Sequence, residues 1–440
     1  MKKYLLLIFA ATVAMAAVSC DPKTPKPVDI TVQLMYDGAN FAQPGIVVTL
    51  ADAAGTASYE AETNASGAVS YTIPIGTYTA SATWKTAEEG VRAVYNGSNP
   101  AVLVADATTT SFKVDLQKVE SQQIIIKEFL STGGPKVPTG TYSDDAYFIL
   151  YNNSDLEADA SDLVFSILTP SNAHATNKYV DESGNLSYEK ADWIPANSAI
   201  WWFTSPVSIP AYSQIVVACF GAIDHTATVP ASVDLSNSAY YWLSNTEIST
   251  IYKAAKYAVS ENIPTSHYLN CSPFGQGTAW LLSNNSPAFF VGRMSQAEAK
   301  ALSENSDAYD HTGGTGAVFN AAKFPKSKVV DCIEIYQAAS VAKSHVRFSS
   351  DLNTGAVVIA TNQGYTAYRN VDKEATEALP ENNGKIVYGY KGGTEDVEGT
   401  TDPSGIDAEA SIKNGAHIIY SDTNDCSKDF HTRKVSSLKK

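Results

Sequence analysis

The chain has 440 residues, of which 44% are hydrophobic, and its formal net charge is −15 at pH 7. This length allows two or three domains of ordinary size, and the hydrophobic fraction excludes extensive disorder. The acidic balance argues against a nucleic-acid partner and against attachment to an anionic membrane surface by charge.

The first 20 residues, MKKYLLLIFAATVAMAAVSC, combine two lysines, a short apolar run and small residues. This order predicts a secretory signal peptide over residues 1–19, whose apolar core is too short to be a membrane-spanning helix. Cys20 follows Ala17-Val18-Ser19 and resembles a bacterial lipobox, although most lipoboxes have Leu where Ala17 stands. The resemblance implies that Cys20 is acylated and tethers the chain to a membrane. The alternative is an ordinary signal peptide with a chance cysteine.

Residues 20–28 contain three prolines, so they predict a stiff, extended tether. Residues 29–119 then alternate apolar and polar side chains, as at Ile30, Val32 and Leu34, which predicts an antiparallel β-sandwich. Within this stretch GIVVTL (45–50), TNASGAV (63–69) and PIGTYT (74–79) resemble the carboxypeptidase-regulatory-like, transthyretin-type sandwich. That resemblance implies a spacer or presentation module.

Residues 120–440 predict a second, larger β unit. Four of its segments resemble the lamin-tail-type immunoglobulin-like sandwich: IIIKEF (124–129), DAYFILYNNS (145–154), IPAYSQIVVA (209–218) and YSDTNDCSKDF (420–430). With the first module, the chain is similar to an uncharacterised family of Bacteroidetes outer-membrane lipoproteins that join a transthyretin-like and a lamin-tail-like module. The resemblance implies no activity.

The second unit is longer than a simple sandwich requires, and we interpret residues about 245–385 as a long α/β insertion. Ser295 to Glu298 form a capping box that predicts a helix, and Asp372 to Leu379 predict another. The polar tail, residues 434–440, is expected to fray. The fold class is therefore mainly β, with two β-sandwich domains, the second carrying the insertion.

Four cysteines follow Cys20, namely Cys219, Cys271, Cys332 and Cys426. In an exported protein they permit two disulfides with three possible connectivities. The alternative is four buried free thiols, and the sequence leaves the choice open.

No reactive constellation is evident along the chain. The seven histidines are scattered, HExxH is absent, and no GxSxG elbow occurs. The adjacent acids Glu88-Glu89 and Asp144-Asp145 do not suggest a glycosidase, because neighbours on a strand point to opposite faces. We therefore expect a protein that is not an enzyme and has no cofactor.

Two groups of residues remain as candidate sites. Oxygen-bearing side chains in one turn, Asp422, Asn424, Asp425 and Asp429, form a weak calcium candidate, although the same residues also stabilise turns through their own backbone. Consecutive rings at Trp201-Trp202 and Tyr241-Trp242 form a candidate ligand-binding platform, because one ring of each pair must face outward on a strand. The alternative is that both faces are covered.

The expected function is a lipid-anchored cell-envelope protein that binds or presents a partner, for example as an accessory to an outer-membrane uptake receptor. The alternative is a carbohydrate-binding surface lipoprotein with the tryptophans as its platform. An enzyme with a site assembled across the insertion is a third interpretation. The expected location is the outer membrane, on its periplasmic or surface side.

Overall fold

The computed structural model describes residues 27–53, 56–88, 90–105, 110–243, 255–275, 282–311, 316–394 and 401–439. The chain divides into two compact units. The described parts of Met1–Lys85 and Val94–Val119 form the first unit, and those of Thr86–Ala93 and Glu120–Lys440 form the second. The sequence predicts one domain over residues 29–119, whereas residues 86–88 and 91–93, which are strand ends, group with the second unit.

The first unit is a sandwich of two sheets around one core. One sheet contains β1 (Val28–Tyr36), β2 (Ala39–Asn40), β5 (Ala68–Ile73) and β8 (Ser111–Asp115); the other contains β3 (Val47–Asp52), β4 (Ser58–Glu62), β6 (Gly76–Glu88), β7 (Val91–Val104) and β9 (Gln117–Gln122). Alternate residues of β1 and β3 face inward and are buried, including Ile30, Val32, Leu34, Val48 and Leu50. The period-two pattern of the sequence therefore arises because one face of each strand packs into the core, as expected.

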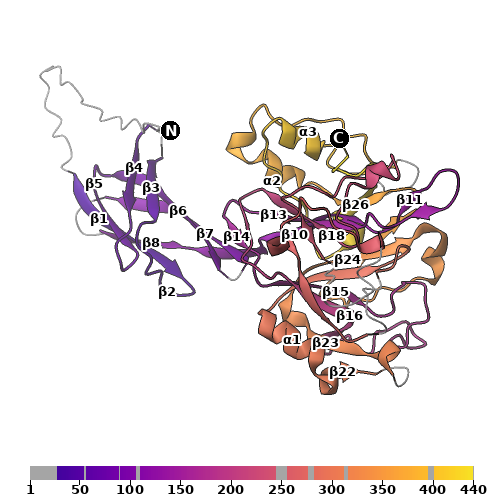
Figure 1. The fold of residues 1–440 in the computed structure, drawn as a ribbon. Coiled ribbons are helices and arrows are strands. Elements are labelled where there is room, and N and C mark those ends of the chain that lie inside the picture. The colour runs from indigo at the N-terminus through magenta and orange to yellow at the C-terminus, as the bar shows by residue number, and fades with distance from the viewer. Residues whose placement is uncertain are drawn as a thin grey trace, which may run out of the picture. The chain divides into compact units, whose positions relative to one another are not determined.

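The second unit contains two larger sheets. One has the order β19-β18-β13-β10-β26-β27, with β10 (Ile124–Leu130), β13 (Tyr147–Asn152), β18 (Gln214–Ala218), β19 (Tyr241–Trp242), β26 (Thr366–Arg369) and β27 (Phe430–Arg433). The other has the order β22-β23-β16-β15-β21-β24-β25, with β15 (Leu163–Leu168), β16 (Trp193–Trp202), β21 (Ala288–Arg293), β22 (Tyr309–Asp310), β23 (Ala321–Pro325), β24 (Val329–Gln337) and β25 (Val357–Ile359). In addition, β20 (Asn270–Pro273) pairs with β16. Figure 1 shows β10, β13 and β18 above β15, β16 and β24.

Side chains from both sheets fill the space between them. The ring of Phe148 on β13 lies 5.0 Å from that of Phe165 on β15 and 4.8 Å from that of Phe289 on β21, measured between ring centroids. These contacts across the two sheets make one continuous apolar core, which is the main source of stability of such a unit.

The outer faces of these sheets are also covered. Helix α1 (Gln296–Glu304) contributes Ala299 to a second apolar cluster on the β15–β16–β21 sheet, and α3 (Ala408–Lys413) contributes Ala408 to another on the β10–β13–β26 sheet. Every residue of β13 and β15 is consequently buried. Apart from Asn152 and Ser166, these strands consist of aliphatic and aromatic residues, because neither face meets water.

The remaining elements are short. Two small antiparallel pairs join β11 (Gly134–Pro135) to β12 (Thr141–Tyr142) and β14 (Ala158–Asp159) to β17 (Ser208–Ile209). Helices α2 (Lys373–Glu377) and α4 (Cys426–Asp429) each span little more than one turn. Described 3-10 turns are His225–Ala227, Ala255–Tyr257, Thr265–His267, Ser306–Ala308, Ala317–Phe319, Lys326–Lys328, Ala338–Lys343 and Pro380–Asn382.

The segment interpreted as an insertion, residues about 245–385, is part of the sandwich itself. Its strand β21 lies between β15 and β24 in the middle of the sheet. The predicted helix signals hold locally: Ser295 and Glu298 form the capping box of α1, and Asp372 caps α2. The extra length therefore supplies β21 to β25 of one sheet and β26 of the other.

All four cysteines of the described chain are buried and form no disulfide, so neither of the two possible disulfides is present. Burial raises the pKa of the Cys219, Cys332 and Cys426 thiols, which keeps them protonated and unreactive. The Cys426 thiol is placed to donate a hydrogen bond to the carbonyl oxygen of Cys332 at 3.6 Å. The second of the two alternatives, four buried thiols, is the one observed.

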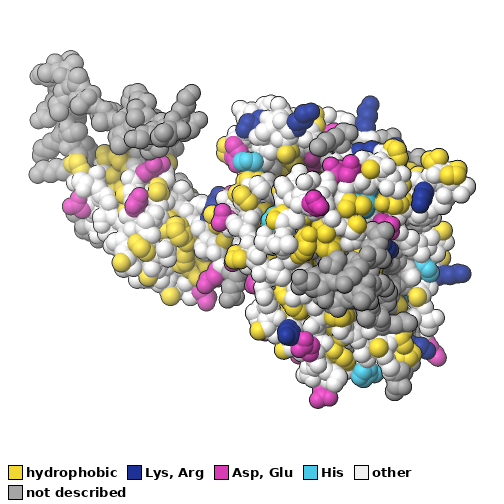
Figure 2. Space-filling view, viewed as in Figure 1, with side chains coloured by type: hydrophobic (Ala, Val, Ile, Leu, Met, Phe, Trp, Pro, Cys, Tyr) yellow, Lys and Arg dark blue, Asp and Glu magenta, His cyan; other side chains and the backbone are white. Residues whose placement is uncertain are grey.

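No described helix is both long and apolar enough to cross a membrane. On the face seen in Figure 2, Asp and Glu are spread over the second unit with Lys and Arg between them. The visible charge therefore does not gather into one patch of a single sign.

Candidate ligand pocket

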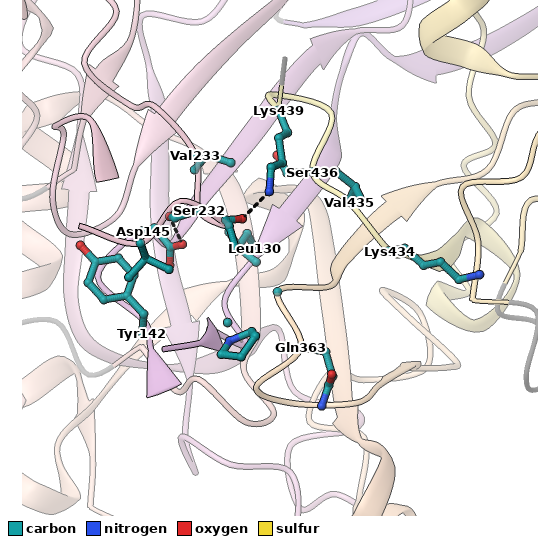
Figure 3. A pocket seen from close by; sticks show the side chains of 15 residues that line it. Leu130, Tyr142, Asp145, Ser232, Val233, Gln363, Lys434, Val435, Ser436 and Lys439 are labelled. Carbon is teal, nitrogen blue, oxygen red and sulfur yellow. Dashed lines mark hydrogen bonds between the residues drawn. The ribbon is translucent and has the colours of Figure 1, made fainter. Parts of the chain in front are cut away.

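A pocket of about 140 Å³ lies in the second unit where several separate segments meet. Leu130 at the end of β10, Tyr142 on β12 and Asp145 just before β13 form part of its wall. The loop 229–233, the turn at Gln363 and the C-terminal residues 434–439 complete it. Figure 3 shows Tyr142, Asp145 and Ser232 together on one side and Gln363 and Lys434 on the other.

Asp145 is the residue with unmet bonding capacity in this pocket. Its side chain is buried, with 5% relative exposure, and its Oδ2 accepts a hydrogen bond from Ser232 Oγ. Its Oδ1 is buried and has no hydrogen-bond partner. Burial raises the pKa of the Asp145 carboxyl, because removal from water disfavours the charged form. The pocket therefore contains an acceptor that the protein itself leaves unsatisfied.

Tyr142 is held in place by a buried histidine. The Tyr142 hydroxyl lies 2.6 Å from His225 Nδ1, and His225 Nε2 lies 2.8 Å from the carbonyl oxygen of Gly221. Since the carbonyl can only accept, Nε2 carries the proton and Nδ1 accepts from the tyrosine. Burial raises the pKa of Tyr142 to about 12. Both nitrogens of His225 are thus used to orient the pocket wall.

The C-terminal residues form another wall and are firmly docked. Glu128 is fully buried and accepts hydrogen bonds from the Ser437 backbone N–H at 3.1 Å and from its hydroxyl. The Tyr147 hydroxyl bonds to Ser436 Oγ, and Lys439 Nζ donates to the Ala231 carbonyl oxygen at 2.8 Å. The expectation of a frayed tail is therefore wrong for residues 434–439, because a buried carboxylate binds it.

The predicted aromatic platform is not exposed. Trp201 and Trp242 have no exposed surface, and Trp202 is 6% exposed. Trp201 packs between the sheets and Trp202 packs under α1, so the two rings do point to opposite faces. Tyr241 is half-buried and stacks on His267 with 4.2 Å between ring centroids. The platform fails because both faces of the sheet are covered.

The acidic turn near the C-terminus is occupied by internal donors. Asp422 Oδ1 accepts from Arg369 Nη1 at 3.2 Å, and Asp429 Oδ2 accepts from the Thr423 N–H at 2.9 Å. Asp425 caps α4, and Asn424 adopts a left-handed φ of 57°. These bonds favour the turn interpretation over the calcium one. Within the described ranges, no group of three or more His, Cys, Asp or Glu is placed to hold a metal ion.

A larger groove of about 460 Å³ includes Asp331, Asp351 and Asp422 in its lining. These carboxylates are paired already: Asp331 and Asp422 with Arg369, and Asp351 with Lys326 at 3.3 Å. The groove therefore has the volume for a ligand, but these three carboxylates already have charged partners within the protein. Cys20, the candidate lipidation site, lies outside the described residues.

Sequence reasoning did not identify Asp145, Tyr142 or the docked tail as parts of a site. The available signal was an aspartate directly before a fully apolar strand. The adjacency of Asp144 and Asp145 argues only against a shared catalytic site, and it does not indicate that Asp145 turns inward. Nothing local indicates that Ser232, 87 residues away along the chain, is its partner.

Fold and pocket together define a predominantly β protein with two compact units, of which the second contains a small polar pocket. The chain belongs to the family described as "Protein of unknown function (DUF4876)", whose model matches residues 212–437, just over half of its length. A comparison of the chain with curated proteins found no match.

Among solved structures, the chain is similar to a DUF4876 family protein from Bacteroides thetaiotaomicron, with a TM-score of 0.60 and 17% sequence identity. That match covers 93% of this chain and 96% of the other, and at this identity it concerns the fold. The major pilin subunit of Bacillus cereus matches with a TM-score of only 0.17, 11% identity and coverage of 77% and 100%. The two module resemblances and the lipoprotein family expected from the sequence remain predictions.

Proposed function

We propose that this protein is a lipid-anchored cell-envelope binding protein whose ligand site is the Asp145 pocket. The observation that supports the proposal is the unpartnered, buried Oδ1 of Asp145. A buried polar atom without a partner costs about 1–3 kcal/mol, and more when it is charged. Proteins retain such a cost mainly where the group has a task other than stability.

The proposed role is binding or presentation and not catalysis. His225 uses both ring nitrogens within the wall, so it has no free nitrogen to act as a base. The Ser232 hydroxyl donates to Asp145 and is buried with it. The chemistry that remains is acceptance of a hydrogen bond from a ligand.

A ligand-free experiment tests the pocket assignment. Asp145→Asn removes the uncompensated charge while keeping the shape, and we expect it to raise the melting temperature at pH 7. Because the folded-state pKa of Asp145 is raised, the wild type regains this stability as the pH falls through that pKa and the carboxyl protonates. The gain of the variant should therefore shrink in acid.

The matched control is Asp159→Asn. Asp159 is exposed, and its carboxylate accepts from the Ser161 N–H at 2.8 Å, so its loss should not stabilise the protein. If Asp145→Asn instead lowers the melting temperature at pH 7, Asp145 is a structural residue and the pocket proposal is wrong.

The envelope part of the proposal rests on Cys20 and the signal that precedes it. Acylation of Cys20 would hold an acidic chain at a membrane that its charge does not favour. We expect Cys20→Ser to move the protein from the membrane fraction to the soluble fraction and to abolish fatty-acid labelling. Unchanged labelling or membrane retention would contradict the anchor. An outer-membrane receptor remains the proposed partner type.

A further inference from the structure

We infer that the Asp145 pocket binds a single uncharged sugar residue, such as the exposed end of a glycan chain. This inference rests on the proposed function, because it names the ligand class of the same pocket. The tryptophan platform predicted from the sequence is buried. The inference therefore places a carbohydrate site in a different part of the fold, which the sequence did not indicate.

The charges around the pocket argue for a neutral ligand. Asp145 contributes a carboxylate, and the Lys439 ammonium group lies beside the same pocket, bonded to the Ala231 carbonyl oxygen, while the Lys434 side chain runs away from Asp145 (Figure 3). A simple anion meets Asp145 and a chain of net charge −15, and a simple cation meets Lys439. A neutral ligand with several hydroxyl groups avoids both conflicts.

The bonding groups also suit hydroxyls, which can donate and accept. Asp145 Oδ1 is a buried acceptor without a hydrogen-bond partner, so the ligand must provide a donor to it. Lys439 Nζ spends one of its three hydrogens on the Ala231 carbonyl, and the exposed amide of Gln363 can donate and accept. A ring bearing several hydroxyls satisfies donors and acceptors together.

The remaining lining is apolar and the space is small. Leu130, Val233 and Val435 present apolar surface that suits the C–H face of a sugar ring. The volume of about 140 Å³ lies below the roughly 300–1,000 Å³ of pockets that enclose drug-sized ligands. One sugar unit at a chain end is therefore the expected occupant, with the rest of the chain outside.

The mouth of the pocket is open to such an end. Ala231 and Gln363 are exposed, and Val435 is 50% exposed. An Ala231→Trp substitution should therefore block the mouth without disturbing the core. Ala297→Trp, at an exposed position of α1 outside this pocket, is the matched control.

The experiment is calorimetric or saturation-transfer NMR titration of the full mature chain, carrying Cys20→Ser for solubility. The probes are methyl glycosides of uncharged hexoses, deoxyhexoses, pentoses and N-acetylhexosamines, with glucosamine and glucuronic acid as charged comparators. We expect at least one uncharged glycoside to bind, with binding at least tenfold weaker in Ala231→Trp and in Asp145→Asn and unchanged in Ala297→Trp.

The outcomes separate the two proposals. If only the amine or only the acid binds, and Ala231→Trp abolishes that binding, the pocket is a ligand site and the sugar assignment is wrong. If no uncharged glycoside binds, the sugar assignment is also wrong, and the Asp145→Asn stability test decides the pocket independently. Glycoside binding that Ala231→Trp leaves unchanged overturns the placement of the sugar in this pocket.

Discussion

Single buried charges bring distant segments of the second unit together. Arg347 and Glu334 are both fully buried, with Arg347 Nε 2.9 Å from Glu334 Oε1. Arg347 Nη1 also donates to the Pro170 carbonyl oxygen at 2.7 Å, and Nη2 donates to that of Ser286 at 2.8 Å. One guanidinium therefore connects three segments that are far apart in sequence. Burial raises the pKa of Glu334, because removal from water disfavours the charged carboxylate. The Arg347 guanidinium opposes this effect, so the charged form of Glu334 depends on Arg347.

Removing one partner of this pair should be costly. Arg347→Met leaves the Glu334 carboxylate buried and unpaired, so we expect the free energy of unfolding to fall by about 3–5 kcal/mol. Urea unfolding at pH 7 measures the change. The double variant Arg347→Met, Glu334→Leu should recover part of the loss, because it removes both charges. A single variant within about 1 kcal/mol of the wild type contradicts the assigned bond network.

His431 makes stability depend on pH. Its Nδ1 donates to Asn370 Oδ1 at 2.7 Å and its Nε2 accepts from the Tyr390 hydroxyl at 2.8 Å, which requires the neutral ring. Burial lowers the pKa of His431 to about 3 from its ordinary 6.5. Between these values the unfolded chain binds a proton that the folded protein does not bind. The contribution of His431 to stability is therefore complete above pH 6.5 and is lost as the pH falls toward 3.

We expect His431→Gln to reduce the slope of unfolding free energy against pH in this window, by up to about 1.4 kcal/mol per pH unit. Urea unfolding at pH 7, 6, 5 and 4 gives the slope. The control is His345→Gln, since His345 is exposed. Equal slopes for wild type and His431→Gln would mean that the ring is not held neutral.

At the scale of elements, both sheets of the second unit are covered by segments fastened through polar contacts. Glu409 in α3 lies 2.7 Å from Lys127 Nζ, and Lys127 is almost fully buried on β10. The Lys127 ammonium lies 5.6–5.7 Å from the ring centroids of Tyr151, Tyr368 and Tyr420. This cation–π contact and ion pair hold the covering layer on the sheet.

The C-terminal segment is fastened in the same way through Glu128. Deleting residues 436–440 removes both hydrogen bonds from Ser437 to this buried carboxylate, and we expect a loss of about 3 kcal/mol or more. Ser437→Ala keeps the backbone N–H and removes the hydroxyl, so its expected loss is about 1–2 kcal/mol. Lys439→Ala, at an exposed position, should change little. Thermal and urea unfolding rank the three variants, and an unchanged deletion variant contradicts a docked tail.

At the scale of the whole molecule, two units of very different size are each built around their own apolar core and do not rely on disulfides. The first unit has a single core between its sheets, and the second has one core between its sheets and further clusters outside them. A unit as large as the second buries enough apolar surface to be stable without a covalent cross-link.

The thiols provide a test at this scale. In the Cys20→Ser chain we expect no reaction of the folded protein with an aromatic disulfide reagent at pH 8. The remaining four cysteines should react fully once guanidinium unfolds the protein without reductant. The melting temperature should not change with reductant. Fewer than four reactive thiols in the unfolded, unreduced protein would indicate a disulfide.

Local patterns in the sequence were sufficient to predict the class of fold and much of the local structure. Alternation at Ile30, Val32 and Leu34 identified the strands of the first unit, because one buried face imposes a period of two. The capping box at Ser295 identified the start of α1, because its bonds are formed within four residues. Both signals depend only on neighbours in the chain.

Which faces are covered and which polar groups meet depends on contacts between distant segments, which no local pattern shows. Trp201 and Trp202 point to opposite faces as the strand requires, but the layers that bury both come from distant segments. Asp145 became a candidate site through Ser232 and the C-terminal tail, which approach it from far along the chain. Long-range packing sets burial, and burial determines whether a ring is core or platform, whether a tail frays and whether a carboxylate remains without a partner.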